Sequence, residues 1–293
     1  MKYLKDIKAL ILIVILLALS ACANSGTTLL NNFAKTNDYT KISNISYGAH
    51  PQNKLDIYNP SISATKNSKN AVIVFFYGGC WGECTTLTKS DYLFVAQSLA
   101  SRGFTTVIAD FRQYPDVDFK GLMLDASNII RWTSQNISKY GGDPNRIIVA
   151  GHSSGAHIAS MLALNPRYLD SVTRKSIRGF VGLAGPYDFL PLDEAYQRVL
   201  FDSSNNYASS QPISFLSATA PPLLILHGGE DTTVGKHNAI NLSKKAERLG
   251  VKHQLILYPA HDHVSILAAL SRPLQGRSSV LKNIVSYSKK YTR

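Results

Sequence analysis

The chain has 293 residues, of which 45% are hydrophobic, and this predicts one large domain that can bury a sizeable core. Its formal net charge is +12, yet lysine and arginine are scattered and nowhere form a run of five or more. Because no nucleic-acid-binding motif accompanies this charge, the sequence argues against a nucleic-acid partner. A basic surface that lies near anionic lipid is the better interpretation.

The first 22 residues have the pattern of an export signal. Three lysines among the first eight residues precede an apolar run from Ala9 to Leu19, which is too short for a good membrane span. The run ends in Leu-Ser-Ala-Cys at residues 19–22, which resembles the bacterial lipobox, whose cysteine is acylated. We therefore expect a lipoprotein signal peptide over residues 1–21, a lipid anchor on Cys22 and a polar tether over residues 22–40. An ordinary signal peptide with a chance cysteine is the alternative.

The expected export bears on the location of the protein and on its cysteines. Ala23 carries no cue for retention at the inner membrane, so we expect a cell-envelope lipoprotein, at the outer membrane where the host has one. If Cys22 carries lipid, Cys80 and Cys84 remain as an even pair in an oxidising compartment. A disulfide between them and two reduced, partly buried thiols are both compatible with the sequence. No spacing of cysteine and histidine indicates a zinc site.

From residue 41 to residue 293 the chain alternates short apolar runs with helical patterns. This alternation predicts a mostly parallel eight-stranded sheet with helices on both faces. Strands are expected at Ile42–Tyr47, Lys54–Tyr58, Ala71–Tyr77, Thr105–Ala109, Ile147–Ala150, Gly179–Leu183, Pro222–His227 and His253–Tyr258. Helices are expected at Asp91–Arg102, Lys120–Tyr140, Ser154–Leu164, Lys236–Leu249 and Val280–Tyr291. The segment Pro186–Pro221 lacks this rhythm, and we interpret it as an insertion that forms a wall of a binding cleft.

A Gly-x-Ser-x-Gly motif lies between a predicted strand and a predicted helix. It reads Gly-His-Ser-Ser-Gly over residues 151–155. A serine on such a sharp strand-to-helix turn projects its Oγ above the sheet edge, and the small flanking residues let the backbone cross closely. The pentapeptide alone is weak evidence, but this setting identifies Ser153 as a candidate nucleophile.

A serine hydroxyl needs a base to take its proton and a carboxylate to orient that base. Where a serine occupies this kind of turn, the acid and then the histidine follow it along the chain. Asp231 follows the strand that ends at His227, with Glu230 as the alternative acid. His263 follows the last strand and is the candidate base, and we expect His261 to be a loop residue satisfied locally.

The loop after the third strand is the candidate oxyanion hole. It reads Tyr-Gly-Gly-Cys-Trp over residues 77–81, and consecutive glycines let backbone N–H groups turn toward a substrate oxygen. We expect the amides of Gly79 and Cys80, joined by that of Ser154, to hold the oxyanion. A plain turn is the alternative.

These residues together resemble the carboxylesterase and hormone-sensitive-lipase-like branch of the α/β-hydrolases, especially its small esterases akin to arylformamidase. The resemblance covers nearly all of residues 45–290. Its motifs are Leu-Asp-Ile-Tyr at 55–58, Asp-Phe-Arg-Gln-Tyr-Pro at 110–115, Tyr-Gly-Gly-Asp-Pro-Asn-Arg-Ile at 140–147 and His-Gly-Gly-Glu-Asp-Thr-Thr-Val at 227–234. The chain departs from the family at Tyr77, where a histidine that braces the oxyanion loop is usual. We expect the Tyr77 hydroxyl, or a Cys80–Cys84 disulfide, to take over that bracing.

The resemblance implies the α/β-hydrolase fold and a serine esterase that works through an acyl-enzyme without metal or organic cofactor. Because the insertion is short and lacks a long amphipathic lid, small or short-acyl esters are the expected substrates. We expect Trp81, Tyr114, Tyr187 and Val264 to line the substrate pocket, with a place in the core as the alternative for each. The competing interpretations are hydrolysis of an amide or formamide, and a catalytically inactive lipoprotein that binds a ligand or a partner.

Overall fold

The computed structural model describes residues 23–61, 69–201 and 207–293. The expected signal peptide over residues 1–21 and the expected lipid site Cys22 lie outside the described residues. Within the described ranges, no helix is both long enough and apolar enough to cross a bilayer.

Eight strands form one sheet in the order β1-β2-β4-β3-β5-β6-β7-β8. The pairs β1–β2 and β2–β4 are antiparallel, and every pair from β4 to β8 is parallel, as the sequence predicted. The strands are β1 (Tyr39–Ser46), β2 (Lys54–Pro60), β3 (Asn70–Phe76), β4 (Thr105–Ala109), β5 (Gly142–His152), β6 (Ile177–Leu183), β7 (Leu223–Gly228) and β8 (His253–Tyr258).

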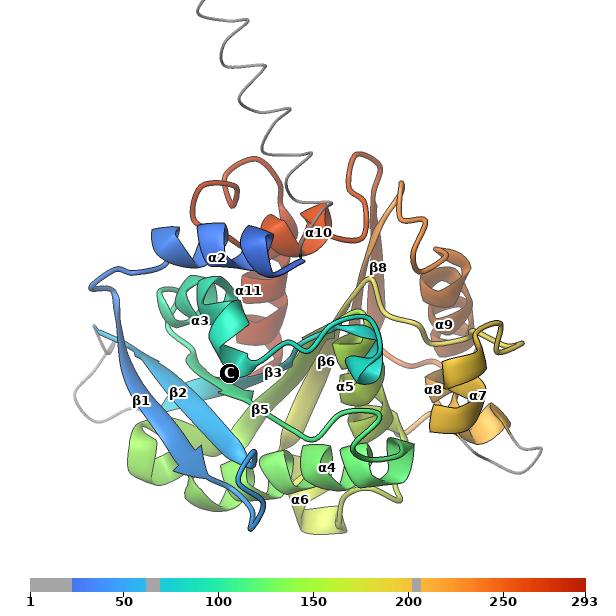
Figure 1. Cartoon of the computed structure of the whole chain (residues 1–293), viewed down its shortest axis with the longest axis horizontal. Coiled ribbons are helices and arrows are strands. Elements are labelled where there is room, and N and C mark those ends of the chain that lie inside the picture. The colour runs from blue at the N-terminus through green and yellow to red at the C-terminus, as the bar shows by residue number, and fades with distance from the viewer. Residues whose placement is uncertain (1–22, 62–68, 202–206) are drawn as a thin grey trace, which may run out of the picture.

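Helices cover both faces of the sheet, with α3 and α11 on one face and α4 and α5 on the other (Figure 1). The α-helices are α2 (Ala23–Phe33), α3 (Leu93–Ala100), α4 (Phe119–Asn136), α5 (Ser154–Leu164), α6 (Ser171–Ser176), α7 (Ala195–Leu200), α8 (Pro212–Phe215), α9 (His237–Arg248), α10 (Ser265–Ala268) and α11 (Val280–Tyr291). Short 3-10 turns are η1 (Cys80–Gly82), η2 (Lys89–Tyr92), η3 (Ile137–Tyr140) and η4 (Tyr207–Ser210).

The central strands match their predicted positions because their side chains are buried on both faces. All five residues of β4 and six of the seven residues of β3 are buried, so both read as continuous apolar runs. The strand β5 begins at Gly142, earlier than the predicted Ile147. After the buried Gly142, the next four residues are exposed or only partly buried, with Arg146 paired to Asp143, so they carry no apolar signal.

The segment expected to be a tether is partly folded onto the domain. Helix α2 occupies much of residues 22–40, and β1 begins at Tyr39. The Asn31 amide donates to the Ser90 carbonyl and accepts from the backbone N–H of Phe94, so it satisfies one unpaired amide at the start of α3. Ala34 is buried, and Leu30 packs against the core. Part of the expected tether over residues 22–40 therefore packs on the domain as a helix.

The insertion between Pro186 and Pro221 contains three short elements in its described part. They are α7, η4 and α8, each of six residues or fewer, which explains why no helical periodicity is visible in the sequence. Helix α6 was missed for the same reason, since its six residues are held mainly by the Asp170 cap.

Candidate active site

Ser153 lies in a strained turn between β5 and α5. Its backbone has φ 55° and ψ −128°, a combination that an ordinary residue avoids. The backbone crosses itself so closely that a Cβ on Gly151 would lie 2.3 Å from the Gly155 carbonyl oxygen. A Cβ on Gly155 would lie 2.1 Å from the carbonyl oxygen of Phe76 in the neighbouring strand. Both glycines of the motif are therefore required by packing, and the turn presents the serine hydroxyl at the carboxyl edge of the sheet.

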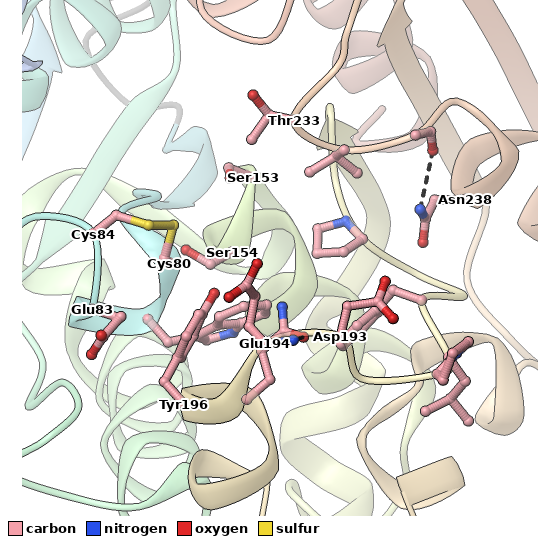
Figure 2. A pocket seen from close by; sticks show the side chains of 18 of the residues that line it. Cys80, Glu83, Cys84, Ser153, Ser154, Asp193, Glu194, Tyr196, Thr233 and Asn238 are labelled. Atoms are coloured by element: carbon pink, nitrogen blue, oxygen red, sulfur yellow. Dashed lines mark hydrogen bonds between the residues drawn. A yellow bond between two sulfur atoms is a disulfide. The ribbon is translucent and has the colours of Figure 1, made fainter. Parts of the chain in front are cut away.

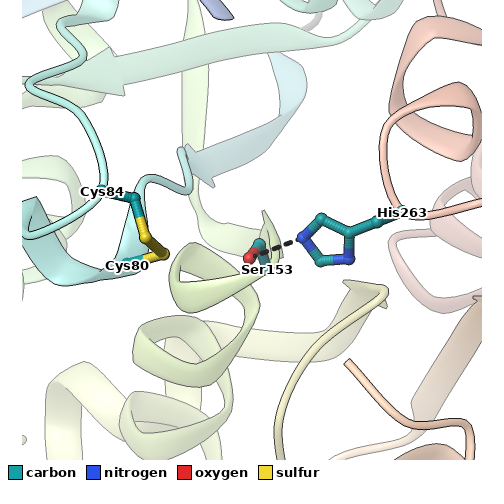
Figure 3. Close-up of a disulfide and its surroundings, with 4 residues drawn as sticks. All are labelled: Cys80, Cys84, Ser153 and His263. Carbon is teal, nitrogen blue, oxygen red and sulfur yellow. Dashed lines mark hydrogen bonds between the residues drawn. A yellow bond between two sulfur atoms is a disulfide. The ribbon is translucent and has the colours of Figure 1, made fainter. Parts of the chain in front are cut away.

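His263 lies on the loop after β8 and bridges the other two candidate residues, and Figure 3 shows its ring directed at Ser153. Its Nε2 is 2.9 Å from the Ser153 Oγ, and its Nδ1 is 2.8 Å from the Asp231 Oδ2. Because a carboxylate only accepts, Nδ1 carries the proton. This leaves Nε2 free to accept the serine proton, which is the tautomer a general base needs.

Asp231 follows β7 and is buried, and both of its carboxylate oxygens accept hydrogen bonds. Its Oδ1 accepts from the backbone N–H groups of Thr233 and Val234, at 2.9 and 2.8 Å. Its Oδ2 accepts from His263 and lies 3.4 Å from the Nε2 of His227. Burial alone raises the pKa of Asp231, but the hydrogen bond and charge of His263 outweigh it and hold that pKa below its ordinary value. The carboxylate is therefore ionised at neutral pH.

The two alternative residues do not reach this cluster. Glu230 is exposed, whereas Asp231 is 8% exposed. The His261 Nδ1 is 3.4 Å from the Ser265 Oγ, and its ring packs edge-on against Tyr258. Within the described residues, no three His, Cys, Asp or Glu side chains are grouped as a metal ion requires.

The candidate oxyanion loop has a left-handed backbone at four consecutive residues. The φ angles are 115° at Gly79, 53° at Cys80, 59° at Trp81 and 118° at Gly82. Non-glycine residues rarely adopt this region, so the loop needs external support. In the described chain, neither Gly79 nor Cys80 uses its backbone N–H in a hydrogen bond.

A disulfide between Cys80 and Cys84 provides part of that support. Figure 3 shows it on the opposite side of Ser153 from His263. The structure thus selects the disulfide over two reduced thiols. Trp81 is also held, because its Nε1 donates to the Nδ1 of His157, 3.1 Å away. Burial lowers the pKa of His157 to about 4, which keeps Nδ1 available as an acceptor.

The tyrosine that braces the oxyanion loop is Tyr92 and not the expected Tyr77. The Tyr77 ring is buried in a stack between Tyr92 and Phe111, and its hydroxyl donates to Asp110 at 3.4 Å. The backbone N–H of Gly78 instead donates to the Tyr92 hydroxyl at 3.3 Å. Tyr77 is therefore anchored in the core at the start of the loop, and Tyr92 holds the loop backbone. Sequence reasoning missed Tyr92 because it lies fourteen residues away in η2.

A cavity of about 690 Å³ opens beside Ser153 (Figure 2). Ser154, the disulfide and Trp81 form one side of it, and the insertion supplies a second wall with Pro186, Phe189, Leu190, Pro191, Asp193, Glu194, Tyr196 and Gln197. This agrees with the predicted role of the insertion. Glu83 joins Asp193 and Glu194 in the lining, and no lysine or arginine lines the described cavity. The cavity is therefore locally acidic in a basic protein.

Of the four predicted pocket residues, Trp81 lines this cavity and the other three do not. Tyr187 is fully buried. Its hydroxyl oxygen packs so closely on Gly182 that a Cβ at that glycine would lie 1.9 Å from it. Tyr114 packs against Tyr196 from outside the cavity, and Val264 is 52% exposed in the loop after His263. The sequence could not show which of these four residues line the pocket, because core and pocket positions use the same residue types.

Comparison with known proteins places this geometry in a family. The chain is 29% identical to an isoprenylcysteine alpha-carbonyl methylesterase of Arabidopsis thaliana over 266 residues, which is 83% of this chain and 60% of that protein. It is 30% identical to the probable carboxylic ester hydrolase LipM of Mycobacterium tuberculosis over 220 residues, 67% of this chain and 49% of that protein. The chain thus spans about half to three-fifths of the length of these relatives.

Solved esterases share the fold. A truncated carbohydrate esterase from gut microbiota has a TM-score of 0.74 at 21% identity and covers 88% of this chain and 98% of its own. Esterase B from Lactobacillus rhamnosis, inhibited by a phosphonate, has a TM-score of 0.74 at 18% identity, covering 95% and 96%. The fold is therefore that of the α/β-hydrolases. Because the BD-FAE family model matches residues 55–246, which is more than half of the chain, this protein belongs to the BD-FAE family.

Proposed function

We propose that the chain is a serine hydrolase that cleaves carboxylic esters of small or short-acyl substrates. The observation that carries the proposal is the hydrogen-bonded chain from Ser153 Oγ through His263 to Asp231, with contacts of 2.9 and 2.8 Å at the mouth of a cavity. The two relatives described above are named as a methylesterase and a carboxylic ester hydrolase, which supports ester chemistry.

In the acylation step, the Ser153 Oγ attacks the ester carbonyl and its proton passes to the Nε2 of His263. Asp231 stabilises the imidazolium that forms and keeps the ring in its productive tautomer. His263 then donates the proton to the leaving alcohol. Water, activated by the same imidazole, hydrolyses the acyl-enzyme and restores the serine hydroxyl.

The tetrahedral intermediates carry a negative oxygen that needs preorganised donors. The backbone amides of Gly79 and Cys80 fill this role, because the left-handed loop leaves both without another partner in the described chain. The amide of Ser154 at the start of α5 is the third donor, and the positive end of that helix adds to its effect.

The cavity restricts the substrate class. Its volume of about 690 Å³ suits a small acid and alcohol rather than a bulk lipid. The carboxylates of Glu83, Asp193 and Glu194 disfavour a substrate that carries its own negative charge. Neutral or cationic esters therefore fit this site best.

The proposal is tested with purified protein on p-nitrophenyl esters of increasing acyl length, with N-formylkynurenine as a competing amide substrate. We expect turnover of the acetate and butyrate esters, loss of that turnover in Ser153→Ala, and labelling of the wild type but not the variant by a fluorophosphonate. Equal activity of wild type and Ser153→Ala contradicts the proposal. If the formamide is cleaved faster than the esters, the proposal of ester hydrolysis is replaced by one of amide hydrolysis. If Ser153 does not react with the fluorophosphonate, the chain is a binding protein and not an enzyme.

We also propose that the protein is an exported lipoprotein, anchored through Cys22 and held at the outer membrane where the host has one. The lysine-rich leader, the apolar run and the lipobox-like residues 19–22 support this. The Cys80–Cys84 disulfide is also in keeping with an oxidising compartment. Metabolic labelling with radioactive palmitate tests it: we expect label in the wild type and none in Cys22→Ser. Equal labelling contradicts lipidation at Cys22.

A further inference from the structure

One buried histidine beside the nucleophile has no part in the reaction described above. His152 precedes Ser153 at the end of β5 and is 5% exposed. Its Nε2 lies 2.8 Å from the backbone carbonyl oxygen of His263. Because a carbonyl oxygen only accepts, His152 donates from Nε2, and its ring is the Nε2–H tautomer when neutral.

The ring of His152 also contacts the ring of His263. The two ring centroids are 4.8 Å apart with an angle of 45° between the planes. His152 therefore holds both the backbone and the side chain of the same residue. The hydrogen bond spans 111 residues of sequence and links the β5 turn directly to the loop after β8.

The charge state of His152 is suited to this contact. Burial, assisted by the nearby charge of His263, lowers the pKa of His152 to about 3. The ring of His152 thus stays neutral at neutral pH, and it does not place a second positive charge beside the imidazolium that forms on His263 during the reaction. Its Nδ1 is buried without a hydrogen-bond partner in the described chain, so no bond on that side competes for the ring.

The hydrogen bond from His152 also holds the backbone of the loop that carries His263. No backbone N–H in the described chain donates to the His263 carbonyl, whereas the carbonyls of Asp262 and Val264 on either side both accept from backbone N–H groups of α10. The catalytic histidine is therefore held at its ring by Asp231 and at its backbone by His152. Loss of either restraint frees the imidazole to move from Ser153.

We propose that His152 is a positioning residue that keeps the His263 imidazole within reach of the Ser153 hydroxyl. This rests on the proposed function, in which His263 is the general base. The donor at Nε2 sets the loop, and the ring face limits rotation of His263. Displacement of a reacting group by about 1 Å can cost roughly 100-fold in rate, so a small shift of this loop is enough to be measured.

The test compares two variants of the full chain on p-nitrophenyl acetate. His152→Phe keeps a flat ring and removes the donor, whereas His152→Gln keeps an N–H donor on a side chain long enough to reach the same carbonyl. We expect kcat to fall roughly 10- to 100-fold in the first variant with KM within about threefold of wild type, and the second to recover most of the loss. Wild-type kcat in His152→Phe, or equal losses in both variants, overturns the proposal.

Two further measurements separate positioning from other causes. Ile129→Ala, a buried change in α4 away from the cavity, serves as the control for lost stability and should lower Tm without lowering kcat. A crystal structure of His152→Phe should show the His263 Nε2 beyond hydrogen-bond distance of Ser153, and an unchanged 2.9 Å contact overturns the proposal. This second readout holds even if Ser153→Ala shows that the chain does not hydrolyse esters, so the two failures are distinguishable.

Discussion

At the scale of single residues, the site depends on how Asp231 is satisfied. Its Oδ1 receives two backbone donors from the next turn, and its Oδ2 receives the ring donor of His263. A buried carboxylate is costly unless its oxygens are hydrogen-bonded, and both oxygens of Asp231 are satisfied here. The same contacts orient the His263 ring, so Asp231 links stability to catalysis.

Substitution Asp231→Asn keeps the shape of this side chain and removes its charge. We expect kcat to fall by about 10³- to 10⁴-fold, because the imidazole then adopts the wrong tautomer and its cation loses a partner. KM should change much less. The matched control is Glu230→Gln, the same change at an exposed neighbouring position, which should keep kcat within about twofold. Steady-state kinetics on p-nitrophenyl acetate test this prediction. A decrease in kcat of less than tenfold in Asp231→Asn contradicts the assignment of Asp231 as the acid.

At the scale of elements, two connections that leave the sheet at its carboxyl edge differ in what they contain, one a strained backbone and the other a partly buried ion pair. The turn after β3 holds four left-handed residues under a disulfide. The loop after β4 places Arg112 against Asp125 of helix α4, with contacts of 2.7 and 2.9 Å. The first connection shapes the oxyanion site, and the second anchors a helix.

Cys84→Ser tests the first connection without altering the amide of Cys80. We expect kcat to fall roughly 10- to 100-fold, because the left-handed loop then relaxes and its donors no longer converge on the oxyanion. A reductant that leaves the fold intact, as judged by circular dichroism, should lower wild-type kcat to the same level and leave the variant unaffected. Unchanged turnover in both comparisons would show that the loop holds its shape without the disulfide.

The second connection predicts how stability depends on pH. Burial by itself raises the pKa of Asp125, but its hydrogen bonds and charge interaction with Arg112 outweigh this and lower that pKa below the unfolded value of 3.8. An acid whose pKa is lower in the folded chain than in the unfolded chain stabilises the fold at any pH above its unfolded pKa. This stabilisation is lost as the pH falls through the pKa of the folded chain. Urea unfolding should therefore show a decline in stability below about pH 4.

Arg112→Ala should lower the free energy of unfolding by about 3 kcal/mol at pH 7, because Asp125 is left charged and buried. The double variant Arg112→Ala with Asp125→Asn should recover part of that loss, since no buried charge remains. Both variants should also show a weaker dependence on pH between 5 and 3. A double variant that is as unstable as the sum of the single changes would show that the pair is not coupled.

At the scale of the whole molecule, overall charge and local charge have opposite signs. The sequence carries a net charge of +12, whereas Glu83, Asp193 and Glu194 line the described cavity without a lysine or arginine. The pKa of Tyr196 in the same lining is raised by burial and further by the charges of Glu194 and Glu83, so these groups act on one another. The acidic lining of the cavity therefore suits an uncharged or cationic ester despite the positive net charge of the chain.

Matched substrates test this separation. An ester with a terminal carboxylate should have a kcat/KM roughly 3- to 10-fold below that of its neutral isostere, and added salt should narrow the gap. Glu194→Gln should reduce the discrimination by raising the rate with the anionic ester. Equal rates for both esters at low ionic strength would show that the acidic lining does not select substrate.

Much of the fold was predictable because parallel strands buried on both faces appear as apolar runs. The predicted bounds of β4, α5, β8 and α11 match the structure. The polar start of β5 and the short helices α6, α7 and α8 were missed, because they are held by caps and tertiary contacts rather than by a periodic apolar face. Helix α2 was missed because the Asn31 contacts that anchor it reach Ser90 and Phe94, far along the chain.

The sequence by itself determined the order of the elements and the three side chains of the candidate site. Each of those side chains follows a strand of recognisable pattern, and the ends of parallel strands must meet at one edge. Only the tertiary structure decided which aromatic residues line the cavity, which tyrosine braces the oxyanion loop and which group holds the His263 backbone. These depend on contacts between residues such as Gly78 and Tyr92, or His152 and His263, whose distance in space has no signature in the sequence.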